Sequence, residues 1–173
     1  MSTQFFVVSD THFTHQNILS FKRADGTPLR DFRSVGEMDE LMIENWNKLV
    51  RPQDHVWHLG DVAMRRQLLP IVRRLNGHKR LIMGNHDIFE VKEYLAAGFQ
   101  KIMGMRVIDG MLLTHVPVHP NSLGRFSLNI HGHLHAGSVL QPDGTPDPRY
   151  VSVCVEKTNY SPIPLENLQK LKP

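Results

Sequence analysis

The sequence predicts an α/β fold in which mixed β-sheets are covered by helices. The first half of the chain alternates short apolar runs with amphipathic segments, a pattern typical of strands followed by helices. The second half consists mainly of short strand-like runs separated by turn residues. Of the 173 residues, 40% are hydrophobic and 21% are charged, which excludes collagen-like, low-complexity and disordered classes. Since domains typically hold roughly 100–200 residues, we expect residues 1–173 to form a single domain.

Three strands and three helices are expected in the first half. The patterns predict strands over residues 4–9, 55–59 and 79–83, and helices over residues 34–50, 66–75 and 88–97. The first helix has the clearest start, because Ser34 is a suitable N-cap and Glu37 follows three residues later. Pro70 marks either the first turn or the middle of the second helix, and Gly98 ends the third.

Short strands dominate the second half. They are expected over residues 99–102, 105–108, 111–116, 126–130 and 150–155. Asp109 and Gly110 stand between two apolar runs, which strongly indicates a hairpin. A loop rich in glycine and proline follows at residues 137–148, and residues 165–171 predict a short helix behind Pro164.

The composition favours a cytoplasmic protein without a membrane partner. Cys154 is the single cysteine, which excludes an internal disulfide framework and a cysteine-rich zinc site. No run approaches the roughly 18 apolar residues that a membrane span needs, and no basic segment precedes the first apolar run. The net charge of +3 is too small to indicate nucleic-acid binding by itself. Eleven histidines in a chain with one cysteine indicate a nitrogen and oxygen metal site or acid–base chemistry.

Polar motifs follow the ends of several predicted strands. They contain seven candidate metal ligands: Asp10, His12, Asp61, Asn85, His115, His133 and His135. Strand ends of an α/β sheet meet in one crevice, and alternation places both side chains of Asp-x-His or His-x-His on one face. Carboxylate, amide and imidazole ligands suit manganese, iron or zinc. Seven ligands are too many for one four-coordinate zinc ion and fit two metal ions that share a bridging carboxylate.

These motifs, in this order, resemble the five signatures of the calcineurin-like metallophosphoesterase superfamily. The resemblance spans residues 10–135 and is closest to the small bacterial and phage phosphoesterases of that superfamily. It is carried by Asp10-x-His12, Gly60-Asp61, Gly84-Asn85-His86-Asp87, His115 and Gly132-His133-x-His135. The resemblance implies a four-layer α/β/β/α sandwich of two mixed sheets, with the site on loops at one sheet edge.

The resemblance also implies a role for each residue. Asp10, His12 and His135 would hold one metal ion, and Asn85, His115 and His133 would hold the other, with Asp61 bridging both. His86 would contact the phosphate, and Asp87 would orient His86. The expected cofactors are two divalent ions, with Mn²⁺ the most active in vitro and Fe, Zn, Ni or Mg as alternatives.

One departure from the superfamily bears on the substrate. Its protein phosphatases carry an arginine soon after Gly-Asp and another after Gly-Asn-His; here only Arg65 could partly fill the first role. This favours phosphodiesters, attacked by metal-activated water because no covalent nucleophile is evident. The alternatives are a phosphomonoesterase, a nucleotide pyrophosphatase or an inactive binding scaffold. The expected partner is a phosphate-ester substrate, with nucleotides and nucleic acids as candidates, and the oligomeric state is left open.

A group of basic residues between Asp61 and Asp87 has two interpretations. It comprises Arg65, Arg66, Arg73, Arg74, Lys79 and Arg80, with no acidic residue between them. Such a run is most simply a solvated helix face, and the alternative is an electropositive rim that attracts an anionic substrate. Among the remaining histidines, His15 and His119 are the best candidates for substrate contact because they lie nearest the motifs.

Overall fold

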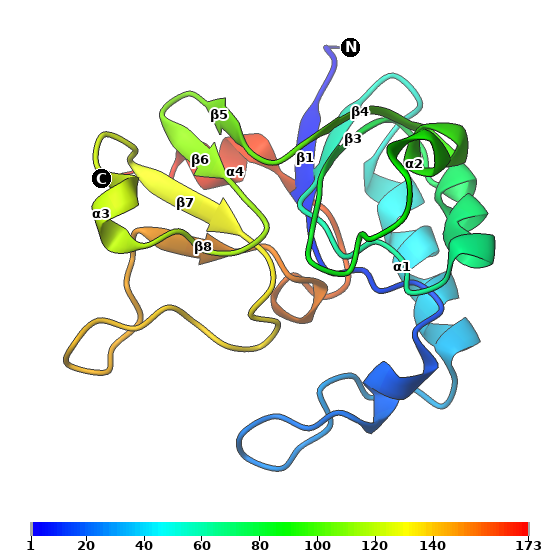
Figure 1. Ribbon diagram of the computed structural model, residues 1–173, viewed down its shortest axis with the longest axis horizontal. Helices are drawn as coiled ribbons and strands as arrows, with labels where there is room; N and C mark the ends of the chain where they lie inside the picture. Colours follow the sequence, from blue (N-terminus) through cyan, green and yellow to red (C-terminus); the bar gives the residue numbers. More distant parts are fainter. Residues whose placement is uncertain (1, 173) are drawn as a thin grey trace.

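The computed structural model describes residues 2–172 and contains two stacked mixed sheets (Figure 1). The first sheet has the order β4-β3-β2-β1-β9, in which β1 to β4 are parallel and β9 is antiparallel to β1. Its strands are β1 (Phe5–Val8), β2 (His55–His58), β3 (His78–Ile82), β4 (Phe99–Met103) and β9 (Ile163–Pro164). The α/β class with two mixed sheets is therefore confirmed.

The second sheet has the order β5-β6-β7-β8. Its strands are β5 (Arg106–Ile108), β6 (Met111–Leu113), β7 (Leu128–His131) and β8 (Tyr150–Ser152). β5 and β6 form the predicted antiparallel hairpin, and the other neighbours are parallel. Asp109 and Gly110 both have positive φ, at 48° and 78°, as a tight hairpin turn requires.

Helices cover one face of the first sheet (Figure 1). These are α1 (Val35–Leu49), the 3₁₀ helix η2 (Arg66–Arg74) and α2 (Val91–Ala97). Ser34 caps α1 as predicted, since its side chain accepts from the Glu37 N–H at 3.1 Å. Two shorter 3₁₀ helices, η1 (Gln16–Ser20) and η3 (Val155–Lys157), lie in loops. None of the helices described over residues 2–172 is long and apolar enough to cross a membrane.

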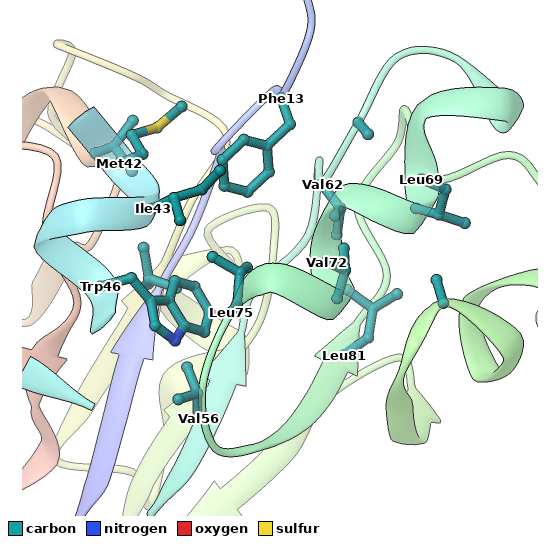
Figure 2. Packing of buried hydrophobic residues seen from close by; sticks show 14 of the residues in the cluster. Phe13, Met42, Ile43, Trp46, Val56, Val62, Leu69, Val72, Leu75 and Leu81 are labelled. Atoms are coloured by element: carbon teal, nitrogen blue, oxygen red, sulfur yellow. The ribbon is translucent and has the colours of Figure 1, made fainter. Parts of the chain in front are cut away.

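Alternating side chains of the central strands fill two cores. Val56 of β2 and Leu81 of β3 point toward the helices, where they pack with Trp46 and Val72 (Figure 2). Each such aliphatic side chain contributes about 1.5–3 kcal/mol when fully buried. Trp46 is 2% exposed, and its indole donates to the Asn76 carbonyl at 3.0 Å.

The second core lies between the two sheets. Val7 and Leu59 from the first sheet meet Leu113 and Ile130 from the second. The helix α4 (Leu165–Gln169), predicted behind Pro164, closes one edge of this core. Both faces of the first sheet are thus covered near its centre, which explains why β1 (FFVV) is a continuous apolar run.

The fourth layer of the sandwich is small. It consists of residues 116–127, including the four-residue helix α3 (Pro120–Leu123). Asn129 of β7 accepts from the Val118 N–H at 2.9 Å, and the Tyr150 hydroxyl donates to the Val118 carbonyl at 2.8 Å. This segment therefore covers the outer face of the second sheet.

Several element boundaries differ from the sequence prediction. The helix expected over residues 66–75 is a 3₁₀ helix with Pro70 at its middle, because proline cannot donate the N–H that an α-helix needs there. The helix expected from residue 88 begins at Val91, since Glu90 and Glu93 form a capping box. β9, α3, η1 and η3, which are two to five residues long, were not expected.

Candidate metal centre

Loops that follow the central strands bring the predicted ligands together. Asp10, Asp61 and Asn85 come after the parallel strands β1, β2 and β3, so they leave the first sheet at the same edge. His115 and His133 follow β6 and β7, which are also parallel. The carboxyl ends of both sheets therefore meet at one crevice, as strand order predicts.

Two groups of side chains are close enough to hold a metal ion. Asp10, His12 and His135 have ligand atoms that all lie within 4.8 Å of one another, and so do Asp10, Asp61 and His115. Asp61 belongs to the second group and also reaches the first, because its Oδ2 lies 3.4 Å from His115 Nε2 and 3.4 Å from His12 Nε2. A carboxylate in this position can contact ions on both sides.

Asn85 and His133 extend the second group. The Asn85 Oδ1 atom lies 2.9 Å from His115 Nε2 and 2.9 Å from His133 Nδ1. His115 Nδ1 is 2.7 Å from the Leu59 carbonyl, which fixes the ring and leaves Nε2 directed toward the acidic side chains. All seven predicted ligands thus lie in one cluster; their roles as ligands stay a prediction.

The buried polar atoms of the cluster fit a bound cation. Among the described residues, Asp10 Oδ1 and both ring nitrogens of His12 are buried without a hydrogen-bond partner. Asp10 is 0% exposed and His12 is 2% exposed. Unpaired buried groups of this kind are costly and rare, and a divalent ion would satisfy the carboxylate oxygen and the imidazole nitrogen together.

The electrostatics favour ionised carboxylates. Burial alone would raise the pKa of Asp10, but the imidazoles of His12 and His115 hold that pKa well below its usual range. The pKa of Asp61 is lowered in the same way, since His115 outweighs the effect of burial. Burial lowers the pKa of His133, with a further contribution from His115. Burial would lower the pKa values of His115 and His135, but Asp61 raises the former and Glu156 raises the latter. A metal ion that binds these two rings must therefore displace protons from them, whereas the carboxylates are already anionic.

Backbone strain is concentrated in these loops. Five of the seven predicted ligands have positive φ: Asp10, His12, Asp61, His133 and His135, with values from 46° to 68°. Residues with a side chain rarely adopt this left-handed conformation, which persists only where the surrounding structure enforces it. The observation connects these loops to function, because strain of this kind clusters at active sites.

Two motif glycines allow the loops to approach one another. A Cβ atom at Gly84 would collide with Asp61 Oδ1, and one at Gly132 would collide with Asp10 Oδ2. The Gly132 loop lies close because the His133 N–H donates to Asp10 Oδ2 at 2.9 Å. Both motif positions therefore require glycine, because any larger residue would collide with a proposed ligand.

Asp87 was expected to orient His86, but its carboxylate instead binds backbone amides. Its carboxylate accepts from the backbone N–H groups of Asp61, Val62 and Gly84 at 2.7–3.1 Å. Among the described contacts, none joins this carboxylate to the His86 ring, because the side chain points back into the protein and is 3% exposed. Asp87 therefore ties two ligand-bearing loops together.

His86 lies at the open side of the cluster. Its ring is exposed, and the ring centroid is 5.6 Å from that of His12. Its backbone N–H donates to Asp61 Oδ1 at 2.9 Å, which leaves the imidazole free to face solvent or substrate.

Two buried supporting residues were missed by sequence reasoning. Glu156 accepts from His135 Nδ1 at 2.9 Å and from Arg30 at 2.8 Å. Arg30 also donates to the carbonyls of Asp10 and Thr11. No local signal could reveal this connection, since Arg30 and Glu156 are 126 positions apart.

Cys154 and His15 also lie beside the cluster. Cys154 is buried, its Sγ lies 3.3 Å from Asp10 Oδ2, and burial raises the pKa of its thiol, so a nucleophilic role is excluded. The His15 ring lies 5.6 Å from that of His12, and burial lowers the pKa of His15 to about 4. His119 accepts from the Asn121 N–H and caps α3.

The basic residues between Asp61 and Asp87 do not form one surface. Arg74 pairs with Glu40, Arg66 pairs with Glu93, and Arg73 donates to the Ala96 carbonyl. Lys79 is buried and donates to two backbone carbonyls, and the pKa of this amine is lowered by burial. Most of the group is therefore engaged around η2, as the solvated-face interpretation expects.

Two hollows flank the cluster. One has a volume of about 770 Å³ and is lined by His135, Phe21 and Lys22 among others. The other has a volume of about 600 Å³ and is lined by Asn85, His115 and Met105 among others. The candidate metal-binding cluster therefore has accessible space on two sides.

Known proteins resemble this chain over nearly its whole length. No protein-family model matches it. The crystal structure of AQ665, a protein of unknown function from Aquifex aeolicus, has a TM-score of 0.72 and 26% identity, covering 98% of this chain and 100% of that one. Nuclease MPE from Pseudomonas putida has a TM-score of 0.48 and 20% identity, covering 76% of this chain and 61% of that one. The uncharacterized protein MJ1445 of Methanocaldococcus jannaschii is 34% identical over 175 residues, covering 96% of this chain and 89% of the relative. At that identity and coverage, the chain belongs to the same family as MJ1445.

Proposed function

We propose that the chain is a metal-dependent phosphoesterase that hydrolyses phosphodiesters. The observation that carries the proposal is the pair of metal-binding groups that share Asp10 and contain buried atoms without partners. Carboxylate, imidazole and amide ligands around two adjacent positions are typical of sites that act at phosphorus.

In this proposal the ligands are divided as the resemblance to the metallophosphoesterase superfamily implies. One divalent ion would be held by Asp10, His12 and His135, and the other by Asn85, His115 and His133. Asp61 would contact both ions, which agrees with its position 3.4 Å from His12 and from His115. When bound, such ions supply positive charge for the phosphoryl oxygens and lower the pKa of a coordinated water.

The chain's own contribution to the reaction centres on His86. An imidazole N–H at this exposed position would donate to a phosphoryl oxygen and pass its proton to the leaving oxygen. Asp87 would hold the Asp61 and Gly84 loops at a fixed separation through its hydrogen bonds to both. Glu156 would orient His135 through Nδ1.

The two flanking hollows support a diester substrate. A phosphodiester carries a group on each side of its phosphorus, and the cluster has open space on both sides. Arg65, the one candidate to grip a phosphomonoester, is exposed at the start of η2 and makes no described ion pair with the cluster.

The proposal is tested by removing and restoring metal. Chelated protein should lose hydrolysis of bis(p-nitrophenyl) phosphate, and added Mn²⁺ should restore it to a greater extent than Mg²⁺. The same preparation should hydrolyse p-nitrophenyl phosphate more slowly. Full activity without metal, or no activity on either ester with any divalent ion, would overturn the proposal; faster monoester hydrolysis would overturn its diester part.

A further inference from the structure

A second polar cavity lies away from the metal centre, between the two sheets at the β4 and β5 edge. Its volume is about 400 Å³, and its lining includes Trp57, Arg80, Lys101, Arg106 and Asp109. It shares no lining residue with the metal-binding cluster. We name it the arginine cavity. Its size is in the range of small-molecule sites, about 300–1,000 Å³.

The cations of the arginine cavity form no ion pair among the described residues, although Asp109 also lines the cavity. Among the described residues, the side chains of Arg80, Lys101 and Arg106 make no hydrogen bond or ion pair. Burial and the charge of Arg106 both lower the pKa of Arg80, so the two guanidinium groups repel one another. This contrasts with the arginines around η2, which are bound to acceptors.

A buried donor in the same wall is also unused. Trp57 is 4% exposed, and its indole N–H has no hydrogen-bond partner among the described residues. The guanidinium carbons of Arg80 and Arg106 lie 5.1 Å and 5.9 Å from the centre of the Trp57 ring. Because a buried donor is normally paired, the unused Trp57 N–H indicates a missing acceptor. Half-buried Arg80 and exposed Lys101 and Arg106 around the same cavity favour an acceptor that carries negative charge.

The other lining residues narrow the ligand class. Trp57 is too deeply buried to offer a free face for base stacking, and the exposed Phe5 ring already stacks on His55. Against the three cations the lining holds one carboxylate, that of Asp109, which accepts from Gln169 Nε2 at 2.6 Å, so an excess of positive charge remains. These features favour a small ligand with several negative charges over a nucleobase.

We propose that the arginine cavity binds a small polyvalent oxyanion of the phosphate or pyrophosphate class. Arg80, Lys101 and Arg106 are its charge partners, and the Trp57 N–H is a neutral donor to it. A bound anion relieves the repulsion between Arg80 and Arg106. The cavity should therefore prefer anions with several negative charges over neutral or singly charged ligands.

The experiment is calorimetric titration of the chelated, metal-free protein with inorganic pyrophosphate. We expect one site per chain, and at least 10-fold weaker binding in Arg80→Gln and in Arg106→Gln, since each variant removes a charge-assisted hydrogen bond to the anion. Arg125→Gln is the matched control, because Arg125 also lies over an aromatic ring, Phe126 at 5.4 Å, but outside the cavity. It should bind pyrophosphate like the parent protein.

Several results would overturn the assignment. They are no binding by the parent protein at millimolar pyrophosphate, unchanged binding in Arg106→Gln, or binding that appears only after Mn²⁺ is added, which would place the anion at the metal centre. A single-stranded oligonucleotide that binds more tightly than pyrophosphate and depends on Arg106 would replace the small-anion assignment. Should Arg80→Gln fail to fold by circular dichroism, Arg106→Gln decides, because Arg106 is exposed on the short strand β5.

Discussion

The metal-binding cluster and the arginine cavity have opposite electrostatic needs. The cluster gathers carboxylates and imidazoles, and its unpaired buried atoms include an acceptor, Asp10 Oδ1. The cavity gathers three cations, and its unpaired buried atom is a donor, Trp57 Nε1. Buried polar atoms are normally satisfied within a protein. The sign of the unmet partner therefore points to the ligand proposed for each region: a cation at the cluster and an anion in the cavity.

The largest effect should come from Asp61, which stands between the two halves of the cluster. Asp61→Asn should lower kcat/KM on aryl diesters by about 10³-fold, on the scale of losing a main electrostatic contact in an active site. Asp143→Asn, in an exposed loop, is the matched control. Steady-state kinetics and elemental analysis of the metal content check it. Turnover like that of the parent enzyme would remove Asp61 from the proposed site.

Replacement of His86 should have the next largest effect on the rate of hydrolysis, and the size of this effect should depend on the leaving group of the substrate. His86→Asn keeps a hydrogen-bond donor but cannot deliver a proton near neutral pH. We expect about 100-fold slower hydrolysis of alkyl or nucleoside diesters and a small change on p-nitrophenyl diesters, at unchanged metal content. His119→Asn, another exposed histidine, is the control. Equal losses on both substrates would limit His86 to contacting the phosphate.

A third prediction concerns whether the hydrogen bond between Glu156 and His135 affects the metal affinity of the cluster. Glu156→Gln keeps an acceptor for His135 Nδ1 but removes the charge, so Mn²⁺ should bind about 10-fold more weakly. Calorimetric titration with Mn²⁺ measures this effect, and thermal unfolding reports separately on the lost pairing with Arg30. Glu40→Gln alters an exposed arginine pair and should leave Mn²⁺ affinity unchanged. A lower Tm with unchanged Mn²⁺ affinity would make Glu156 purely structural.

Asp39 provides a smaller, pH-dependent effect near the cluster. It is buried on α1 and accepts from the Thr14 N–H at 3.1 Å, and burial raises its pKa to about 6. Because the folded pKa lies above the usual value, the stability due to protonated Asp39 is complete below pH 4 and is lost as pH rises through 6. Asp39→Asn should therefore raise the free energy of unfolding by about 1 kcal/mol at pH 8 relative to pH 4. Urea unfolding of Asp39→Asn and of the parent protein at pH 4 and pH 8 measures this effect. If the two proteins differ in free energy of unfolding by the same amount at both pH values, the raised pKa of Asp39 is contradicted.

The smallest effect should be the coupling between the two regions. They share no residue, so Arg106→Gln should change metal-dependent kcat/KM by less than about 2-fold. In turn, Asp61→Asn should change pyrophosphate affinity of the metal-free protein by a similarly small factor. A double-mutant cycle of Arg106→Gln and Asp61→Asn measures the coupling, with kcat/KM of the metal-loaded protein and pyrophosphate affinity of the metal-free protein as the two readouts. Strong coupling would mean that the two regions act as a single site.

The sequence by itself determined the features that depend on local pattern. The period of apolar residues placed α1, with Ser34 as its cap, and the Asp109-Gly110 pair placed the β5–β6 hairpin. The order of motifs after strands also predicted that Asp10, Asp61 and His115 would meet, because parallel strands end at one edge. These predictions succeed because each rests on neighbours in the chain or on a general rule of sheet topology.

Only the tertiary structure decided the partners of these residues. Glu156 reaches His135 and Arg30 across long stretches of chain, and Asp87 binds backbone amides of the Asp61 loop instead of orienting His86. Arg80 stood in a basic run of the sequence, yet strand pairing and sheet stacking separate it from its neighbours and place it beside Trp57. The physical reason is that buried charges take partners from whatever the fold brings near, and sequence spacing does not record those distances.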